Sequence, residues 1–255
     1  MTALKNFLYL PVFLLLLAVC SGCASDPDLL LNSDLSIEEL ESRMAQRSDP
    51  AGNYRKSKAF LFRQVVKTPQ FLAPDLEDMM ETRMLIPDKF RITTLKDNAP
   101  VQIICSNGNT GWMADVSSKK LYHLSGHQLQ QLLTLAKLGT PAGEYRKIFQ
   151  DVKIFRCKND DGNFYLLDCK GINGNTFRIY IDAVTFLPAR MNGKIQAGHS
   201  TLNYDSKVKT YGNYNGVIIP KVTETIQNGQ KQIIEIINYE LNPELTDKDF
   251  LPPVF

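Results

Sequence analysis

Most of the chain after residue 55 alternates between apolar and polar side chains with the period of a β-strand. Within Thr176–Asp182, for example, every second residue is Phe or Ile. Helical patterns do not alternate with these runs, so the sequence predicts a mainly β (α+β) fold with one curled antiparallel sheet of about 10–11 strands. The β-rich runs are residues 60–66, 84–86, 90–96, 101–105, 153–156, 164–169, 176–182, 187–194, 201–210, 216–227 and 230–241. The strongest hairpin signal is Asn228-Gly229, between the last two.

Two segments have helical periodicity instead. Ser36 and Glu39 have the spacing of a capping box, which predicts a short amphipathic helix that ends near Arg47. A second helix is predicted from about Gly126 to Leu138, before Gly139 and Pro141. The apolar positions are Ile37, Leu40 and Met44 in the first helix, and Leu129, Leu132, Leu133 and Ala136 in the second.

Several predicted strands are apolar on both faces, as in Val217–Ile219. A solvated face of an antiparallel sheet alternates cleanly, so both faces of these strands need cover. Two modest helices cover little of such a sheet, which predicts an internal apolar pocket. The alternative is a sheet packed on its helices without a cavity. Strand alternation alone does not say which face of each strand lines the pocket. The candidate wall residues are Phe60, Phe62, Ile103, Phe177, Ile179 and Ile234. The candidate lid is the helical stripe Leu129, Leu132, Leu133 and Ala136.

The N-terminal segment predicts export and lipidation. Phe7–Val19 is an apolar run too short to span a bilayer as a helix, but suitable for an export signal. Ser21-Gly22-Cys23 resembles the lipobox of bacterial lipoproteins, although Cys20 stands where that pattern prefers Leu. The predicted divisions are a signal peptide at 1–22, a tether at 23–34 and a single domain at 35–255. By the same resemblance, Ala24 after the acylated Cys23 favours the periplasmic face of the outer membrane.

The composition excludes some partners, and no motif indicates catalysis. A formal net charge of +2 does not indicate a nucleic-acid-binding surface. The sequence has no Gly-x-Ser-x-Gly elbow and no phosphate-binding loop. His123 and His127 are four residues apart but lack a third ligand nearby, and His199 is isolated. We therefore expect no enzyme activity, no metal site and no cofactor.

Three cysteines follow Cys23, and an oxidising envelope permits a disulfide between two of them. Cys157 and Cys169 face each other across a hairpin if its loop has three or five residues. A two-residue turn at Asp161-Gly162 instead places Cys157 opposite Leu166. The Cys157–Cys169 bridge is therefore a candidate that depends on register, with Cys105 left as a buried thiol.

Three stretches together resemble the LolA/LolB-like lipoprotein carrier superfamily. They are the pair Ile86–Ile92 and Ile103–Trp112, then Tyr211–Pro220, and finally Ile236–Pro252, along which Asn, Leu, Asp, Phe and Pro occur in that order. The resemblance implies an unclosed β-barrel, lidded by helices, whose concave apolar face holds acyl chains. No binding residue of the family is carried over to this chain.

The function expected from these features is non-enzymatic binding or transfer of a lipid or lipoprotein. The expected partners are an acyl lipid or lipoprotein ligand and the membrane, reached through the N-terminal lipid anchor. The alternative is a structural or envelope-sensing lipoprotein that binds another envelope protein through the same scaffold.

Overall fold

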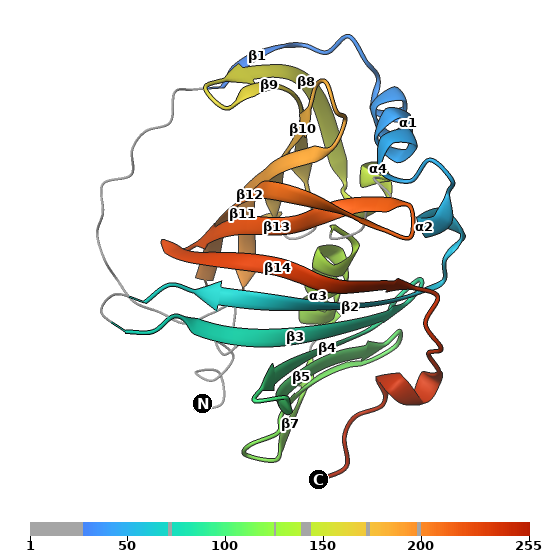
Figure 1. Ribbon diagram of the computed structural model, residues 1–255, viewed down its shortest axis with the longest axis vertical. Helices are drawn as coiled ribbons and strands as arrows, with labels where there is room; N and C mark the ends of the chain where they lie inside the picture. The colour runs from blue at the N-terminus through green and yellow to red at the C-terminus, as the bar shows by residue number, and fades with distance from the viewer. Residues whose placement is uncertain (1–27, 71–72, 125, 139–143, 172–173, 198–199) are drawn as a thin grey trace.

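The computed structural model describes residues 28–70, 73–124, 126–138, 144–171, 174–197 and 200–255. All strands in this part belong to one antiparallel sheet of fourteen, in the order β1-β8-β9-β10-β11-β12-β13-β14-β2-β3-β4-β5-β6-β7. The sheet curls strongly, with β1 at one end and β7 at the other (Figure 1). These two strands do not pair, so the barrel is unclosed, and the predicted fold class is confirmed. No helix in the described residues is long and apolar enough to cross a membrane.

The sheet has more strands than predicted. The first seven are β1 (Leu29–Asn32), β2 (Ala59–Thr68), β3 (Leu76–Leu85), β4 (Lys89–Lys96), β5 (Ala99–Asn107), β6 (Gly111–Asp115) and β7 (Lys120–Leu124). The others are β8 (Asp151–Asn159), β9 (Gly162–Lys170), β10 (Thr176–Asp182), β11 (Pro188–Ala197), β12 (Ser200–Tyr214), β13 (Val217–Gln227) and β14 (Gln230–Leu241). The three strands absent from the prediction, β1, β6 and β7, are four or five residues long, too short to show a clear alternation.

Local sequence signals explain several elements. Ser36 and Glu39 form the predicted capping box at the start of α1 (Ile37–Ser48), whose Ile37, Leu40 and Met44 are buried. Asn228 and Gly229 both have positive φ, 47° and 84°, and join β13 to β14. The remaining helices are α2 (Asn53–Lys56), α3 (Gly126–Leu138), α4 (Tyr145–Ile148) and the 3-10 helix η3 (Asp247–Phe250).

Helices α1, α3 and α4 pack on the same face of the sheet, which we call the inner face. Two apolar clusters form beneath them. The first joins α1 and α4 to β8–β12, with Leu40, Tyr145 and Phe177 among its members. The second joins α2 and α3 to β2–β7, β13 and β14, with Phe60 and Leu129 among its members. The two clusters adjoin at the middle strands, where β12 of the first cluster pairs with β13 of the second.

The outer face of β5 and β6 is covered by the C-terminal segment. Phe250 of η3 is fully buried against Ile103, Cys105 and Trp112. Ion pairs hold this segment in place, including Arg83–Asp249 at 2.8 Å and Lys89–Asp247 at 2.7 Å. Ile103 therefore lies on the face opposite to the helices.

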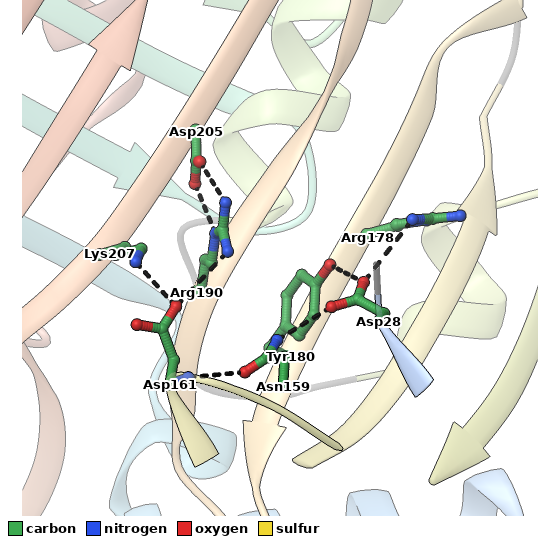
Figure 2. Close-up of polar contacts among 8 residues, drawn as sticks. All are labelled: Asp28, Asn159, Asp161, Arg178, Tyr180, Arg190, Asp205 and Lys207. Carbon is green, nitrogen blue, oxygen red and sulfur yellow. Dashed lines mark hydrogen bonds and ion pairs between the residues drawn. The ribbon is translucent and has the colours of Figure 1, made fainter. Parts of the chain in front are cut away.

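Within the predicted tether at 23–34, Leu29–Asn32 pair with β8 as strand β1. Asp28, just before β1, is bound on the outer face (Figure 2). Its carboxylate accepts hydrogen bonds from Tyr180 Oη at 2.7 Å and Asn159 Nδ2 at 2.9 Å, and lies 3.7 Å from Arg178. The neighbouring Arg190 donates to Asp205 at 2.8 Å. Asp28 thus attaches the N-terminal end of the described chain to β8 and β10.

Asp28→Asn is expected to loosen β1 near neutral pH. Burial opposes ionisation of Asp28, but hydrogen bonds from Asn159, Tyr180 and Cys157 and the charge of Arg178 outweigh it and lower the pKa. The carboxylate therefore stabilises the fold above its unfolded pKa of about 3.9, and this contribution is lost as pH falls through the folded pKa. We expect a loss of about 1 kcal/mol of local stability, measured by amide hydrogen exchange in β1.

The control is Asp160→Asn, which changes an exposed carboxylate in the adjacent turn and leaves β1 protected. In acid, below the pKa of Asp28 in the folded protein, the amide hydrogens of β1 should exchange at the same rate in the Asp28→Asn variant and in the parent protein. A difference that persists unchanged into acid would contradict this account of Asp28.

Candidate functional site

An apolar cavity of about 310 Å³ lies on the inner face, between the two helix-covered clusters. Its floor consists of residues of β2 and β10–β14, and its sides come from α1, α4 and the end of α3. Its apolar wall includes Met44, Phe62, Leu138, Tyr145, Ile179, Phe186, Pro188, Met191, Val208, Tyr211, Ile218, Ile219, Pro220, Ile234, Ile236 and Tyr239. The volume is at the lower end of the roughly 300–1,000 Å³ typical of ligand sites.

Strand alternation explains which side chains reach the cavity. On β2, Phe62 and Gln64 line it, and on β14, Ile234 and Ile236 do, because residues two apart share a face. Bulges between Val208 and Tyr211 and between Ile236 and Asn238 change this parity locally. The floor therefore forms where the long central strands are bent.

Three of the six predicted wall residues line the cavity: Phe62, Ile179 and Ile234. Phe60 and Phe177 are on the inner face too, but they are fully packed within the clusters on either side of the cavity. Ile103 was placed wrongly, because it points to the outer face, against Phe250. Its neighbour Ile104 is the residue of β5 that faces inward.

Most of the other wall residues carry no sequence signal that predicts their position in the cavity. Tyr145 follows Glu144, a residue with positive φ, in a one-turn helix with no periodicity to detect. Phe186 likewise lies in a turn and has a positive φ. A signal was present on β13, where Ile218, Ile219 and Pro220 form an apolar run without alternation. Such a run indicates burial on both sides of a strand.

The polar groups of the wall are few and largely neutral. Ser206 shares a hydrogen bond of 2.9 Å with Thr225, and Gln64 Nε2 lies 3.6 Å from Met80 Sδ. The charged Arg190 is bound by Asp205, and Lys221 lies 3.8 Å from Glu235. Among the described residues, no carboxylate, imidazole or thiol lines the cavity. This arrangement can hold an apolar chain, with hydrogen-bonding groups along one part of the wall.

Burial keeps the tyrosines of the wall and the cysteines of the clusters neutral. It raises the pKa of Tyr145 and Tyr239 well above the usual value, and that of Tyr211 to about 12. It also raises the pKa of the Cys105 thiol to about 12. None of these groups is ionised near neutral pH, so none is an activated nucleophile or base.

The predicted disulfide between Cys157 and Cys169 is wrong, since both are free thiols. The turn between β8 and β9 is Asp160-Asp161, which pairs Cys157 with Phe164 and Cys169 with Val152. Cys157 consequently faces outward and Cys169 inward, in different clusters. A bridge cannot join side chains on opposite faces of a sheet without moving the backbone.

Helix α3 packs mainly beside the cavity. Leu129 is buried in the second cluster, and Leu132 and Leu133 are half-buried against it. Leu129 lies so close to the backbone of β6 that a Cβ at Gly111 would be 2.8 Å from its Cδ1. Leu138 is the residue of α3 that lines the cavity, and the side chain of Ala136 lies outside the described residues.

Leu129→Ala is expected to destabilise the fold by about 2–5 kcal/mol, because it removes a buried side chain from a packed cluster. Chemical denaturation measures this loss. The matched control, Leu121→Ala on β7, truncates an exposed leucine and should change stability by about 0.5 kcal/mol or less. Affinity of the folded fraction for an acyl probe should not change. Tighter binding by Leu129→Ala would instead indicate that α3 is a movable lid.

His123 is the one histidine whose side chain lies in the described part of the chain. His123 is exposed on β7, while the side chain of His127 and all of His199 lie outside the described residues. Cys23 is also outside them. No group of three or more His, Cys, Asp or Glu side chains that could hold a metal ion occurs within them.

Comparison with known proteins shows similarity at the level of structure. No family model and no curated protein match the chain. A solved LolA superfamily protein from Nitrosomonas europaea is 14% identical, with a TM-score of 0.58, over 86% of this chain and 98% of that one. A DUF1329 family protein from Desulfovibrio piger is 11% identical, with a TM-score of 0.57, over 84% of this chain and 95% of that one.

A third solved structure, described as an outer membrane lipoprotein-sorting protein domain from Vibrio parahaemolyticus, is 11% identical with a TM-score of 0.53. The match covers 84% of this chain and 97% of that one. At such low identity the likeness concerns the fold. The unclosed, helix-lined sheet and these matches together show that the chain has a LolA-like fold.

Proposed function

We propose that this protein binds an acyl lipid or the acylated end of a lipoprotein, without catalysing a reaction. The observation that carries the proposal is the apolar cavity on the inner face. Its wall offers hydrocarbon and aromatic surface to a chain, and its hydrogen-bonding groups, such as Gln64 and Ser206, suit the polar end of an amphiphile. The outer-membrane lipoprotein-sorting domain from Vibrio parahaemolyticus, which shares the fold, supports this class of ligand.

Burial of hydrocarbon supplies the affinity. Each CH₂ group transferred from water into the cavity contributes about 0.8 kcal/mol. A cavity of about 310 Å³ holds one chain or part of one, so several acyl chains need additional space. The helices α1 and α4, which contribute Met44 and Tyr145 to the wall, pack against the sheet through apolar side chains. Their displacement is the route by which a larger ligand enters.

The proposed location is the periplasmic face of the outer membrane, with Cys23 as the lipid-bearing residue. The Ser21-Gly22-Cys23 junction and the apolar run before it support this proposal. Several acyl chains on one cysteine give durable anchoring, whereas one chain alone binds a membrane marginally. An anchored domain of this kind receives or holds its ligand next to the bilayer.

Native mass spectrometry of the full protein, extracted from membranes, tests the proposed function. We expect a bound species whose mass corresponds to an acyl lipid or an acylated peptide, in addition to the covalent lipid at Cys23. Protein delipidated in organic solvent and refolded should lose that species and regain it when incubated with phospholipid. Protein that carries no non-covalent lipid, and does not acquire one, would contradict the proposal. A co-purified protein in its place would favour the alternative of a partner-binding lipoprotein.

A further inference from the structure

A run of exposed leucines forms the edge of the sheet at β1. Leu29, Leu30 and Leu31 are 56%, 38% and 56% exposed, and no other three consecutive large hydrophobic residues are exposed in the described part of the chain. Among the described strands, β1 is at the edge of the sheet and pairs with β8 alone. Natural sheets normally protect such an edge with charged residues or Pro. Three leucines at this position indicate a contact outside the domain.

Basic side chains lie next to the leucines. Lys158 pairs in register with Leu29, and Arg156 with Leu31, so these residues share one face of the edge. Lys158 is exposed and has no ion pair with the described residues. An apolar strip beside a free cation is complementary to an anionic lipid surface, where hydrocarbon and negatively charged headgroups are adjacent.

The contacts of Asp28 limit how far this edge can be from a membrane anchor. Asp28 is bound to Tyr180, Asn159 and Arg178 on the outer face (Figure 2), so the chain is attached to the sheet from Asp28 onward. Only five residue steps separate Asp28 from Cys23, so a fully extended chain spans at most about 18 Å. If Cys23 carries the lipid, β1 is the strand nearest to the bilayer along the chain.

We propose that Leu29, Leu30, Leu31 and Lys158 form a membrane-contacting edge that seats the domain against an anionic phospholipid bilayer. This inference rests on the proposed anchoring at Cys23. The lipid anchor keeps the protein at the membrane, and the leucine edge sets its orientation there. The β1–β8 end of the sheet then faces the bilayer, and β3 to β7 lie farther from it (Figure 1).

Tryptophan fluorescence in the full, lipidated protein tests the proposed edge. The natural Trp112 is buried and gives a constant background. One variant carries Leu31→Trp, and the matched control carries Leu76→Trp at the start of β3, where the leucine is 59% exposed. Both are reconstituted in vesicles of equal parts phosphatidylcholine and phosphatidylglycerol, with or without bromine on the acyl chains. Metabolic acyl labelling reports separately whether Cys23 is lipidated.

We expect the Leu31→Trp emission to shift to the blue and to be quenched by brominated lipid, while the Leu76→Trp emission stays unchanged. Lys158→Glu in the Leu31→Trp background should reduce the quenching. Lipidated protein in which Leu31→Trp is not quenched would overturn the proposed edge while leaving the anchor intact. A blue shift that is not accompanied by quenching, and that becomes larger at higher protein density, would indicate that the edge contacts a second copy of the protein. This result would also overturn the proposed membrane contact. Protein that lacks the acyl label would contradict the anchoring on which the inference rests.

Discussion

Ile234→Trp should weaken binding of an acyl probe to the cavity by roughly a hundredfold while the protein stays folded. Ile234 lies on β14, where it pairs with Val66 and Thr223, and its side chain lines the cavity. An indole at this position occupies space that ligand CH₂ groups need. If the indole excludes four CH₂ groups, each of which contributes about 0.8 kcal/mol, the binding free energy falls by about 3 kcal/mol and Kd rises roughly a hundredfold. Titration with a fluorescent fatty acid measures the change.

The cavity accommodates the larger side chain with little strain, so the free energy of unfolding should fall by about 1–3 kcal/mol at most. The control is Ile237→Trp on the same strand, where the isoleucine is 48% exposed and outside the cavity. That variant should bind the probe as the parent protein does. Equal affinity for both variants, with both folded, would show that the ligand binds elsewhere.

Cys23→Ala should remove the protein from the membrane fraction or leave it as a precursor that keeps its signal. In our proposal the acyl chains on Cys23 supply the energy that anchors the protein to the membrane. Electrostatic attraction cannot replace them, because the mature chain has 28 basic and 27 acidic residues once Lys5 is removed. Cell fractionation together with metabolic labelling by a fatty acid measures both outcomes.

Cys20→Ala is the matched control, because it changes a cysteine three residues away in the same segment. Val19, which precedes Cys20, is bulky for a cleavage position, so we expect this variant to be labelled and membrane-bound. Acyl-labelled Cys23→Ala protein in the membrane fraction would contradict the assignment of the anchor to Cys23.

Short-range interactions made several elements predictable. The capping box of Ser36 and Glu39 and the positive φ of Asn228 and Gly229 involve residues at most three apart. They identify the start of α1 and the β13–β14 hairpin without knowledge of the rest of the fold. The predominance of β-periodicity was likewise sufficient to predict an antiparallel sheet that curls.

The elements that the sequence did not reveal depend on distant partners. β1 has four residues and is a strand because it pairs with β8, more than a hundred residues away. The β8–β9 register depends on which two residues form the turn, and a shift from Asp161-Gly162 to Asp160-Asp161 changes every pair in that hairpin. Neither two-residue turn pairs Cys157 with Cys169, because these residues would meet only across a longer loop of three or five residues.

The sequence by itself determined that the chain is mainly β, that its strands carry more apolar surface than two helices cover, and where α1 and α3 lie. Only the tertiary structure decided which apolar residues face the cavity. Alternation is symmetric between the two faces of a strand, so Ile103 and Ile104 were equivalent until Phe250 covered one face and α3 the other. The direction of curl, the bulges and the docking of helices on the inner face break that symmetry, and the cavity forms where the two clusters adjoin.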